Sequence, residues 1–330
     1  MAGFRSQLAA VLAARQQHVS AVLSALLLAV LMSSSAVYAG TIVRVSTTYG
    51  DFSIELLDEV APRTTQNFLN YVNRGAYNGT FIHRLEPGFV IQGGGYRFQP
   101  FVGPIVVPAD PPVVNEFSVS NTRGTLSMAK LGENPDSATS QWFVNLTDNS
   151  ANLDTQNGGF TVFARVLGDG MAVADAIAAN PIANLGGFAN SIPLRADTSG
   201  NVSSNANVAA NNFINLSTVV TQRYSSALHV FEYVSGRLII SVDGGTAGLF
   251  SLNLSLVQSD PQIVFELNAD TMVALASRPA LSATWSATDN RLRIPEVEIN
   301  NNGVVSLIRN VVMVLSDPVL QRFTLESYES

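Results

Sequence analysis

Hydrophobic and polar residues alternate along much of the chain, and this period of two predicts β-strands. Apolar and polar side chains interleave over residues 42–46, and a second such run covers residues 52–57 after a turn at Tyr49, Gly50 and Asp51. Two alternating runs joined by a short turn predict a β-hairpin at the start of a domain.

Apolar residues with helical spacing interrupt this strand pattern at two places. After Pro62, one apolar stripe of a helix is formed by Thr65, Phe68, Leu69 and Val72, and Gly75 ends the run. A second, short helix fits residues 171–178, after a glycine-rich turn. Short strands and turns rich in Gly, Pro and Asn fill the region between, so the pattern predicts a β-rich domain with two helices.

The composition shifts to Asn, Ala, Ser and Gly over residues 180–212, which predicts a long loop with little core. Residues 213–220 then have the pattern of a strand, and we expect this strand to close the first domain. The resulting division is a leader over residues 1–39, a first domain over 40–221 and a second domain over 222–330.

The second domain contains an internal repeat. Residues 236–240 (GRLII) match 290–294 (NRLRI), 257–261 (VQSDP) match 314–318 (VLSDP), and 265–267 (FEL) match 323–325 (FTL). Each copy alternates like a strand, and one sheet cannot bury its face alone, so two facing copies predict a β-sandwich-like domain. A binding or attachment module and a mere spacer are both compatible with this pattern.

The N-terminus has the pattern of an export signal. Arg5 and Arg15 precede a 12-residue apolar stretch at residues 21–32, and small residues lead to a cleavage position after Ala39. The mature chain would begin at Gly40, in the periplasm of a Gram-negative bacterium. An uncleaved membrane anchor is the alternative, and no later run is long enough to span a bilayer.

Composition excludes several kinds of chemistry. The chain has no cysteine and three histidines, so it cannot build a disulfide framework, a thiolate metal site or a histidine-rich metal site. Lys130 is the only lysine and the formal net charge is −7, which argues against nucleic acid as a partner. We therefore expect neither a metal nor a cofactor.

One stretch combines polar and apolar side chains in a way that suggests a binding groove. Residues 81–95 read FIHRLEPGFVIQGGG, in which a turn at Pro87 and Gly88 separates two strands. Because successive side chains of a strand point to opposite faces, His83 and Arg84 must diverge. An arginine beside an apolar floor predicts a groove for a peptide or a small molecule.

This stretch resembles the F-H-R-x-x-P-G-F-x-x-Q-G-G signature of the cyclophilins, which are peptidyl-prolyl cis-trans isomerases. Residues 124–130 (GTLSMAK), 137–144 (SATSQWFV) and 159–166 (GFTVFARV) resemble the family in the same order and spacing. The resemblance covers residues 41–221 and is greatest to the exported bacterial branch. It implies a mainly β fold, an eight-stranded antiparallel barrel capped by two helices.

The resemblance also implies roles for individual residues. Arg84 would be the catalytic arginine, Gln92 would support it, and His83 would organise the site rather than transfer protons. The proline pocket would be lined by Phe89, Val90, Phe143 and Leu153, with Phe160 at its rim. The groove for the residues before proline would be bordered by Ala129, Lys130 and Gln141.

Two functions follow from this resemblance. The first is an isomerase that accelerates X–Pro isomerisation while exported proteins fold, with proline-containing polypeptides as its substrates. The second is a weakly active protein that binds proline-containing segments and is tethered to an envelope partner by its C-terminal domain.

Overall fold

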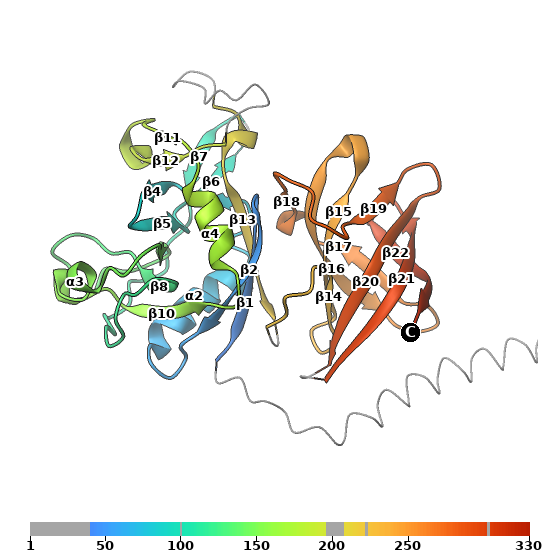
Figure 1. Ribbon diagram of the computed structural model, residues 1–330, viewed down its shortest axis with the longest axis horizontal. Coiled ribbons are helices and arrows are strands. Elements are labelled where there is room, and N and C mark those ends of the chain that lie inside the picture. The colour runs from blue at the N-terminus through green and yellow to red at the C-terminus, as the bar shows by residue number, and fades with distance from the viewer. Residues whose placement is uncertain (1–39, 100, 196–207, 222–223, 302–303) are drawn as a thin grey trace, which may run out of the picture.

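The computed structural model describes residues 40–330 apart from 100, 196–207, 222–223 and 302–303 (Figure 1). The expected export signal, residues 1–39, lies outside the described residues. The described chain forms two β-structures side by side, joined after the last strand of the first (Figure 1). No helix within these described ranges is long and apolar enough to cross a membrane.

The first sheet forms an antiparallel barrel. Its strands, in the order of their pairing, are β4 (Arg84–Glu86), β5 (Val90–Gly93), β9 (Trp142–Asn145), β8 (Thr125–Met128), β10 (Val162–Val166), β2 (Gly50–Leu56), β1 (Ile42–Thr47), β13 (Asn215–Thr221), β3 (Thr80–Phe81), β6 (Tyr96–Gln99) and β7 (Gly103–Val106).

The two ends of this order meet in a single extended segment. β3 pairs with β13, β4 pairs with β5, and only Ile82 and His83 separate β3 from β4. Across that gap, the Ile82 amide donates to Ile214 O and the His83 amide donates to Gln92 O. Counted with β3 and β4 as one, eight strands follow one another around the barrel, and β6 and β7 form an added hairpin. The mainly β, cyclophilin-like fold is therefore confirmed.

Two helices pack against this barrel, as the apolar spacing predicts. α2 (Pro62–Asn73) lies against β10 and β13, and α4 (Met171–Ala178) lies against β2 and β5. Pro62 at the first turn suits a helix start, where a backbone N–H is not needed. The carboxylate of Glu116, from a distant loop, accepts hydrogen bonds from the Arg63 and Thr64 amides and so caps α2. A single further turn forms α3 (Ser150–Leu153).

The described part of the Asn- and Ser-rich segment is more ordered than its composition predicts. It contains the short pair β11 (Ile182–Ala183) and β12 (Ile192–Pro193). Ala189, Ile192 and Leu194 are buried with Phe81 and Phe213 in a small cluster. The expectation of little core is therefore wrong here, because a few well-spaced apolar residues suffice to cover this end of the barrel.

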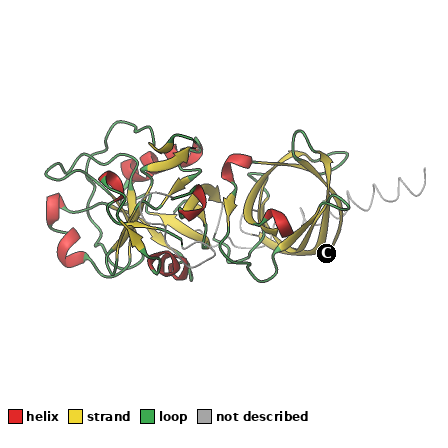
Figure 2. Ribbon diagram, turned by 90° about the horizontal axis from the view of Figure 1, so that it is seen from above, coloured by secondary structure: helices red, strands yellow, loops and turns green. Residues whose placement is uncertain are grey.

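The second sheet closes into a barrel of seven strands (Figure 2). Its closed ring runs, in order, through β15 (Arg237–Asp243), β19 (Ala283–Ser286), β20 (Arg291–Asn301), β21 (Val304–Asp317), β22 (Arg322–Glu329), β17 (Val264–Leu267) and β16 (Leu249–Gln258). Pairing of β15 with β16 completes the ring. The expected sandwich of two facing sheets is thus replaced by one closed sheet, because the edges of the two copies pair with each other.

The same pairing pattern occurs twice in this barrel, as the internal repeat of the sequence predicts. β14 (Val230–Glu232) runs antiparallel to β15 and parallel to β20, whereas β19 runs antiparallel to β20 and parallel to β15. At the junction of the copies, Phe265 of β17 lies directly opposite Phe323 of β22. The two copies, β14–β17 and β19–β22, therefore repeat one pattern of strand pairing and share one core.

Polar contacts join the two barrels. The Ala276 amide donates to Thr48 O at 2.7 Å, and the Ser217 hydroxyl donates to Thr271 O at 2.9 Å. Both carbonyls belong to loops or short helical turns, and β18 (Val273–Ala274) lies against β1 and β13. Hydrogen bonds between polar groups therefore join the walls of the two barrels, and β13 is one of the strands of the first barrel that make this contact.

Candidate functional site

Arg84 and Gln92 face each other across the β4–β5 hairpin. The two residues are directly opposite in the strand register, and Arg84 Nη1 donates to Gln92 Oε1 at 3.3 Å. Gly88, with φ of 69°, makes the turn that sets this register, and a side chain there would be strained. The side chain of Arg84 is 38% exposed, so its guanidinium is fixed on one side and open to a ligand on the other.

His83 points the other way and is buried, as the period of a strand predicts. Gln141 Oε1 accepts a hydrogen bond from Gln92 Nε2 at 2.8 Å and contacts His83 Nε2 at 3.2 Å. Because that oxygen is an acceptor, Nε2 of His83 carries the proton. Burial, reinforced by the charge of Arg84, lowers the pKa of His83 to about 4. His83 is therefore neutral at physiological pH and serves as a donor that orients Gln141.

The predicted pocket residues form one apolar cluster beside Arg84. Val90, Phe143 and Leu153 are buried, and the partly buried members packed against them are Phe89, Ala129 and Phe160. The rings of Phe143 and Phe160 meet edge to face, with 5.8 Å between their centroids. The structure thus brings together six residues from two strands, one helical turn and the loops beside them, although Phe89 and Phe160 are 71 positions apart in the sequence.

Backbone hydrogen bonds tie the loops of this cluster together. Phe89 O accepts bonds from the Leu146 amide at 2.9 Å and from Asn149 Nδ2 at 3.0 Å. The Phe160 amide donates to Leu153 O at 2.9 Å. These bonds fix the pocket side chains in place without using the side chains themselves.

Lys130 holds the loop that carries Phe160, and Ala129 is joined to Gln141 through its backbone. The Ala129 amide donates to Gln141 O at 2.9 Å. Lys130 Nζ donates to Asn157 O and Gly159 O, at 2.7 and 2.5 Å, and lies 4.8 Å from the centre of the Phe160 ring. Partial burial lowers the pKa of Lys130. Its ammonium group therefore holds the loop that carries Phe160.

Glu86 and Ser191 also belong to the site, although the sequence analysis does not single them out. Glu86 Oε1 lies 3.3 Å from Arg84 Nε and accepts a hydrogen bond from the Ser191 hydroxyl at 2.9 Å. The spacing of Arg84 and Glu86 by two in one strand is a signal that could have shown they share a face. Ser191 is distant in sequence, and no local signal marks it.

An aromatic wall completes the surroundings of His83. The ring of Tyr96 meets His83 edge to face at 5.0 Å and stacks on Phe188 with 3.9 Å between centroids. Phe188 belongs to the segment that was expected to be a plain loop. This segment therefore contributes to the site as well as to the end of the barrel.

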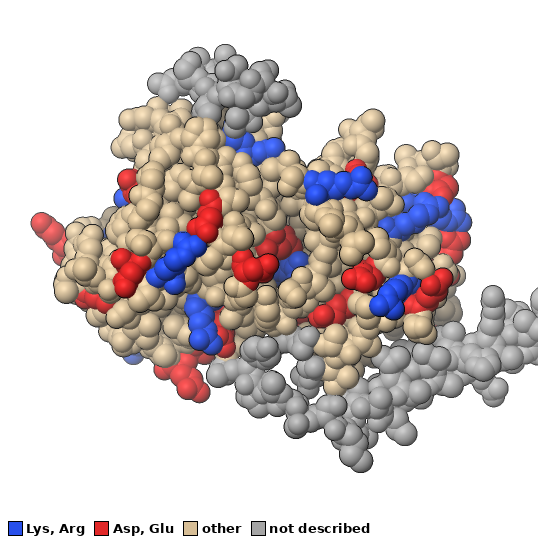
Figure 3. All heavy atoms as spheres, viewed as in Figure 1, with Lys and Arg blue, Asp and Glu red and all other residues tan. Residues whose placement is uncertain are grey.

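Charged side chains are sparse on the face of the molecule shown in Figure 3. On the face shown in Figure 3, acidic and basic side chains form small mixed groups, and most of the surface carries no charge. Among the described residues, no three histidine, aspartate or glutamate side chains gather as they would around a metal ion.

Comparison with known proteins agrees with this geometry. Residues 42–196 match the family model for cyclophilin type peptidyl-prolyl cis-trans isomerase/CLD. The chain is 42% identical over 165 residues to a peptidyl-prolyl cis-trans isomerase of Acinetobacter baylyi, a match that covers 49% of this chain and 85% of that protein. It is 41% identical over 175 residues to peptidyl-prolyl cis-trans isomerase A of Dickeya dadantii, covering 52% and 88%.

A solved structure is similar as well. A cyclophilin type peptidyl-prolyl cis-trans isomerase of Cryptosporidium parvum, crystallised in the presence of the dipeptide Ala-Pro, covers 56% of this chain and 99% of its own, with 22% identity and a TM-score of 0.40. The sequence matches show that the chain belongs to the cyclophilin-type peptidyl-prolyl cis-trans isomerases. The matched family residues end before the second barrel begins.

Proposed function

We propose that Arg84 catalyses rotation about X–Pro bonds of exported polypeptides that are still folding. The observation that carries this assignment is a half-exposed guanidinium, held by Gln92 and Glu86, beside the apolar cluster around Phe143. Family membership indicates which reaction is catalysed, and this arrangement contains a hydrogen-bond donor and an apolar surface, which are the groups that the reaction requires.

Rotation about an X–Pro bond is slow because resonance in the C–N bond imposes a barrier of about 18–20 kcal/mol. In the twisted transition state, the prolyl nitrogen regains its lone pair and can accept a hydrogen bond. The planar ground state cannot accept it, so a donor placed there stabilises only the transition state. Arg84 suits this role, because arginine stays charged and its donors form a rigid fork.

The other site residues hold the substrate and the arginine. The proline ring would occupy the cluster of Val90, Phe143 and Leu153, while the preceding carbonyl rotates. Gln92 uses its oxygen for Arg84 and its nitrogen for Gln141, so it fixes the guanidinium on the side away from the ligand. His83 stays neutral, so no proton transfer is needed.

The site of action that we propose is the periplasm. The support comes from the sequence, in which two arginines, an apolar stretch and small residues lead up to Ala39. Fractionation of the native host, followed by N-terminal sequencing, tests this. A soluble periplasmic form that starts at Gly40 is expected, and a membrane-bound form that keeps Met1 would overturn cleavage.

A refolding assay distinguishes an isomerase from a protein that only binds proline-containing segments. The assay uses a substrate protein whose refolding rate is limited by prolyl isomerisation. The full chain at catalytic concentration should accelerate the slow refolding phase. Binding of the substrate without acceleration would instead favour the tethered, weakly active protein as the native role.

A further inference from the structure

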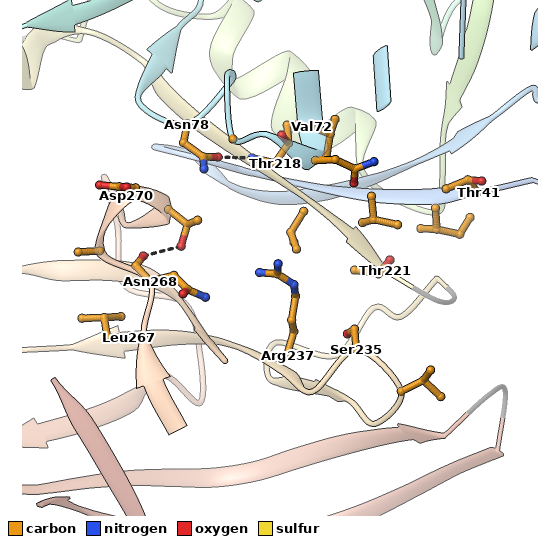
Figure 4. A pocket seen from close by; sticks show the side chains of 18 residues that line it. Thr41, Val72, Asn78, Thr218, Thr221, Ser235, Arg237, Leu267, Asn268 and Asp270 are labelled. Atoms are coloured by element: carbon orange, nitrogen blue, oxygen red, sulfur yellow. Dashed lines mark hydrogen bonds between the residues drawn. The ribbon is translucent and has the colours of Figure 1, made fainter. Parts of the chain in front are cut away.

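A cavity of about 840 Å³ lies between the two barrels, away from the isomerase site (Figure 4). The first barrel contributes the start of β1, the end of β13, the end of α2 and the loop after α2. The second contributes the start of β15 and the helical turn at Ala269–Thr271. Hydroxyl and amide side chains alternate with apolar ones in its lining, and Arg237 is the one cationic group among the described residues that line it.

The internal duplication shows what is unusual about Arg237. In the second copy, the equivalent Arg291 makes a bidentate ion pair with Glu326, with N–O distances of 2.6 and 2.7 Å. Arg291 lies opposite Val314, which lies opposite Thr324, and Glu326 is two residues further along that strand.

The first copy has the same register but lacks the carboxylate. Arg237 lies opposite Ser255, which lies opposite Glu266, and the residue two positions further is Asn268. Asn268 Nδ2 donates to the Ser255 hydroxyl at 3.0 Å rather than pairing with the arginine. An amide therefore occupies the place of the acid in the copy that faces the cavity.

This exchange leaves the Arg237 guanidinium without the ion pair that Arg291 makes. Glu232 lies directly opposite Arg237 on β14, but its carboxylate accepts a hydrogen bond from Asn300 Nδ2 at 2.8 Å. Within the described residues, the side chain of Arg237 makes no hydrogen bond or ion pair, and it points into the cavity (Figure 4). Asp270 also lines the cavity, but it is exposed and lies to one side of the guanidinium (Figure 4). A planar, bidentate donor of this kind matches a carboxylate.

An open strand edge beside the cavity favours a peptide as the source of that carboxylate. β3 pairs with β13 only at Asn215 and Leu216. Further along that side, the Thr218 amide donates to Asn78 Oδ1 at 3.4 Å, and no other described strand pairs there. Val220, the next residue of β13 whose backbone faces that side, lines the cavity. An extended peptide can add to such an edge through its backbone.

We propose that this cavity binds an acidic peptide segment, whose carboxylate pairs with Arg237 as Glu326 pairs with Arg291. Such a segment would give the enzyme a second contact with a polypeptide substrate or partner, separate from the proline pocket. The inference is independent of catalysis by Arg84, since neither Arg237 nor Asn268 touches the isomerase site.

Calorimetric titration of the full chain at low ionic strength tests the proposal, with two acetylated and amidated peptides, STVEVTS and STVQVTS, as probes. The glutamate peptide should bind at least about tenfold more tightly than the glutamine peptide, because a charge-assisted, bidentate hydrogen-bond pair is roughly twice as strong as a neutral one. Arg237→Ala should remove this preference, whereas Arg291→Ala, the matched change in the other copy, should keep it.

Two substitutions at Asn268 sharpen the test. Asn268→Glu restores the acid of the other copy, so it should occupy Arg237 internally and weaken the glutamate peptide at least about tenfold. Asn268→Gln, a neutral control with a side chain as long as that of glutamate, should bind the peptides as the unmodified chain does.

Three results would count against the proposal. Equal affinity for both peptides, or undiminished binding of the glutamate peptide by Arg237→Ala, would overturn it. Tighter binding of digalacturonate than of the glutamate peptide would overturn the assignment to a peptide. X–Pro isomerisation should be unchanged in all these variants, which separates this result from a failure of the proposed catalysis.

Discussion

The burial of His83 predicts that the first barrel loses stability as the pH falls. The side chain is neutral in the folded state, where its pKa is about 4, and titrates near 6.5 in the unfolded chain. Between these values the unfolded state binds more protons, so acid favours unfolding. The stabilisation is complete above pH 6.5, falls progressively below it, and is lost below about pH 4.

The size of this effect follows from the difference between the two pKa values. At about 1.36 kcal/mol for each pH unit, a difference from 6.5 to 4 corresponds to about 3 kcal/mol in total. Between pH 7.5 and 4.5, His83 should therefore lower the free energy of unfolding by about 2–3 kcal/mol. His229 is also buried with a lowered pKa and acts in the same direction, so the comparison must isolate His83.

Urea unfolding of two matched chains makes that comparison. Trp142 is buried in the first barrel and Trp285 lies in the second, so a Trp285→Phe background lets fluorescence report the first barrel alone. His83→Gln in this background removes the titrating group. The chain with His83 should lose about 2–3 kcal/mol more stability between pH 7.5 and 4.5 than the chain with Gln. Equal losses in the two chains would refute the claim that His83 is buried in its neutral form.

Three substitutions test other parts of the structure. Phe143→Ala should lower the free energy of unfolding by about 3–5 kcal/mol and kcat/KM by more than about tenfold, since it empties a buried part of the proposed proline pocket. Full activity with an intact fold would contradict the pocket assignment. Glu86→Gln should change the free energy of unfolding by less than about 1 kcal/mol, because the Arg84–Glu86 ion pair is partly exposed. It should nevertheless lower kcat, with little change in KM, because Arg84 is held less firmly. Restored kcat in Glu86→Asp would separate an effect on positioning from an effect on folding. Phe265→Ala should destabilise the second barrel by about 3–5 kcal/mol, measured by Trp285 fluorescence, without altering isomerisation; a parallel loss of activity would show that the barrels unfold together.

Local patterns predicted the parts of the site that depend on local geometry. The period of a strand placed His83 and Arg84 on opposite faces, and the turn at Gly88 brought Gln92 opposite Arg84. The meeting of Phe143, Leu153 and Phe160 was expected only through the family resemblance, because nothing in their own spacing indicates contact.

Long-range contacts could not be predicted in the same way. Ser191 reaches Glu86 from a segment whose composition indicates a loop, and Glu116 caps a helix that is distant in sequence. Alternation along a strand shows which side chains are buried but not which edges pair, so a sandwich and a closed barrel have the same sequence pattern. The pairing of β15 with β16, and of β17 with β22, decided between them.

The most direct test of the account compares the full chain with its Arg84→Ala variant in an X–Pro isomerisation assay, with the fold of both checked by circular dichroism. Because the arginine stabilises only the transition state, kcat/KM should fall about 100-fold or more while binding of the peptide changes little. Equal rates for the two folded proteins would contradict the assignment of Arg84 as the catalytic residue.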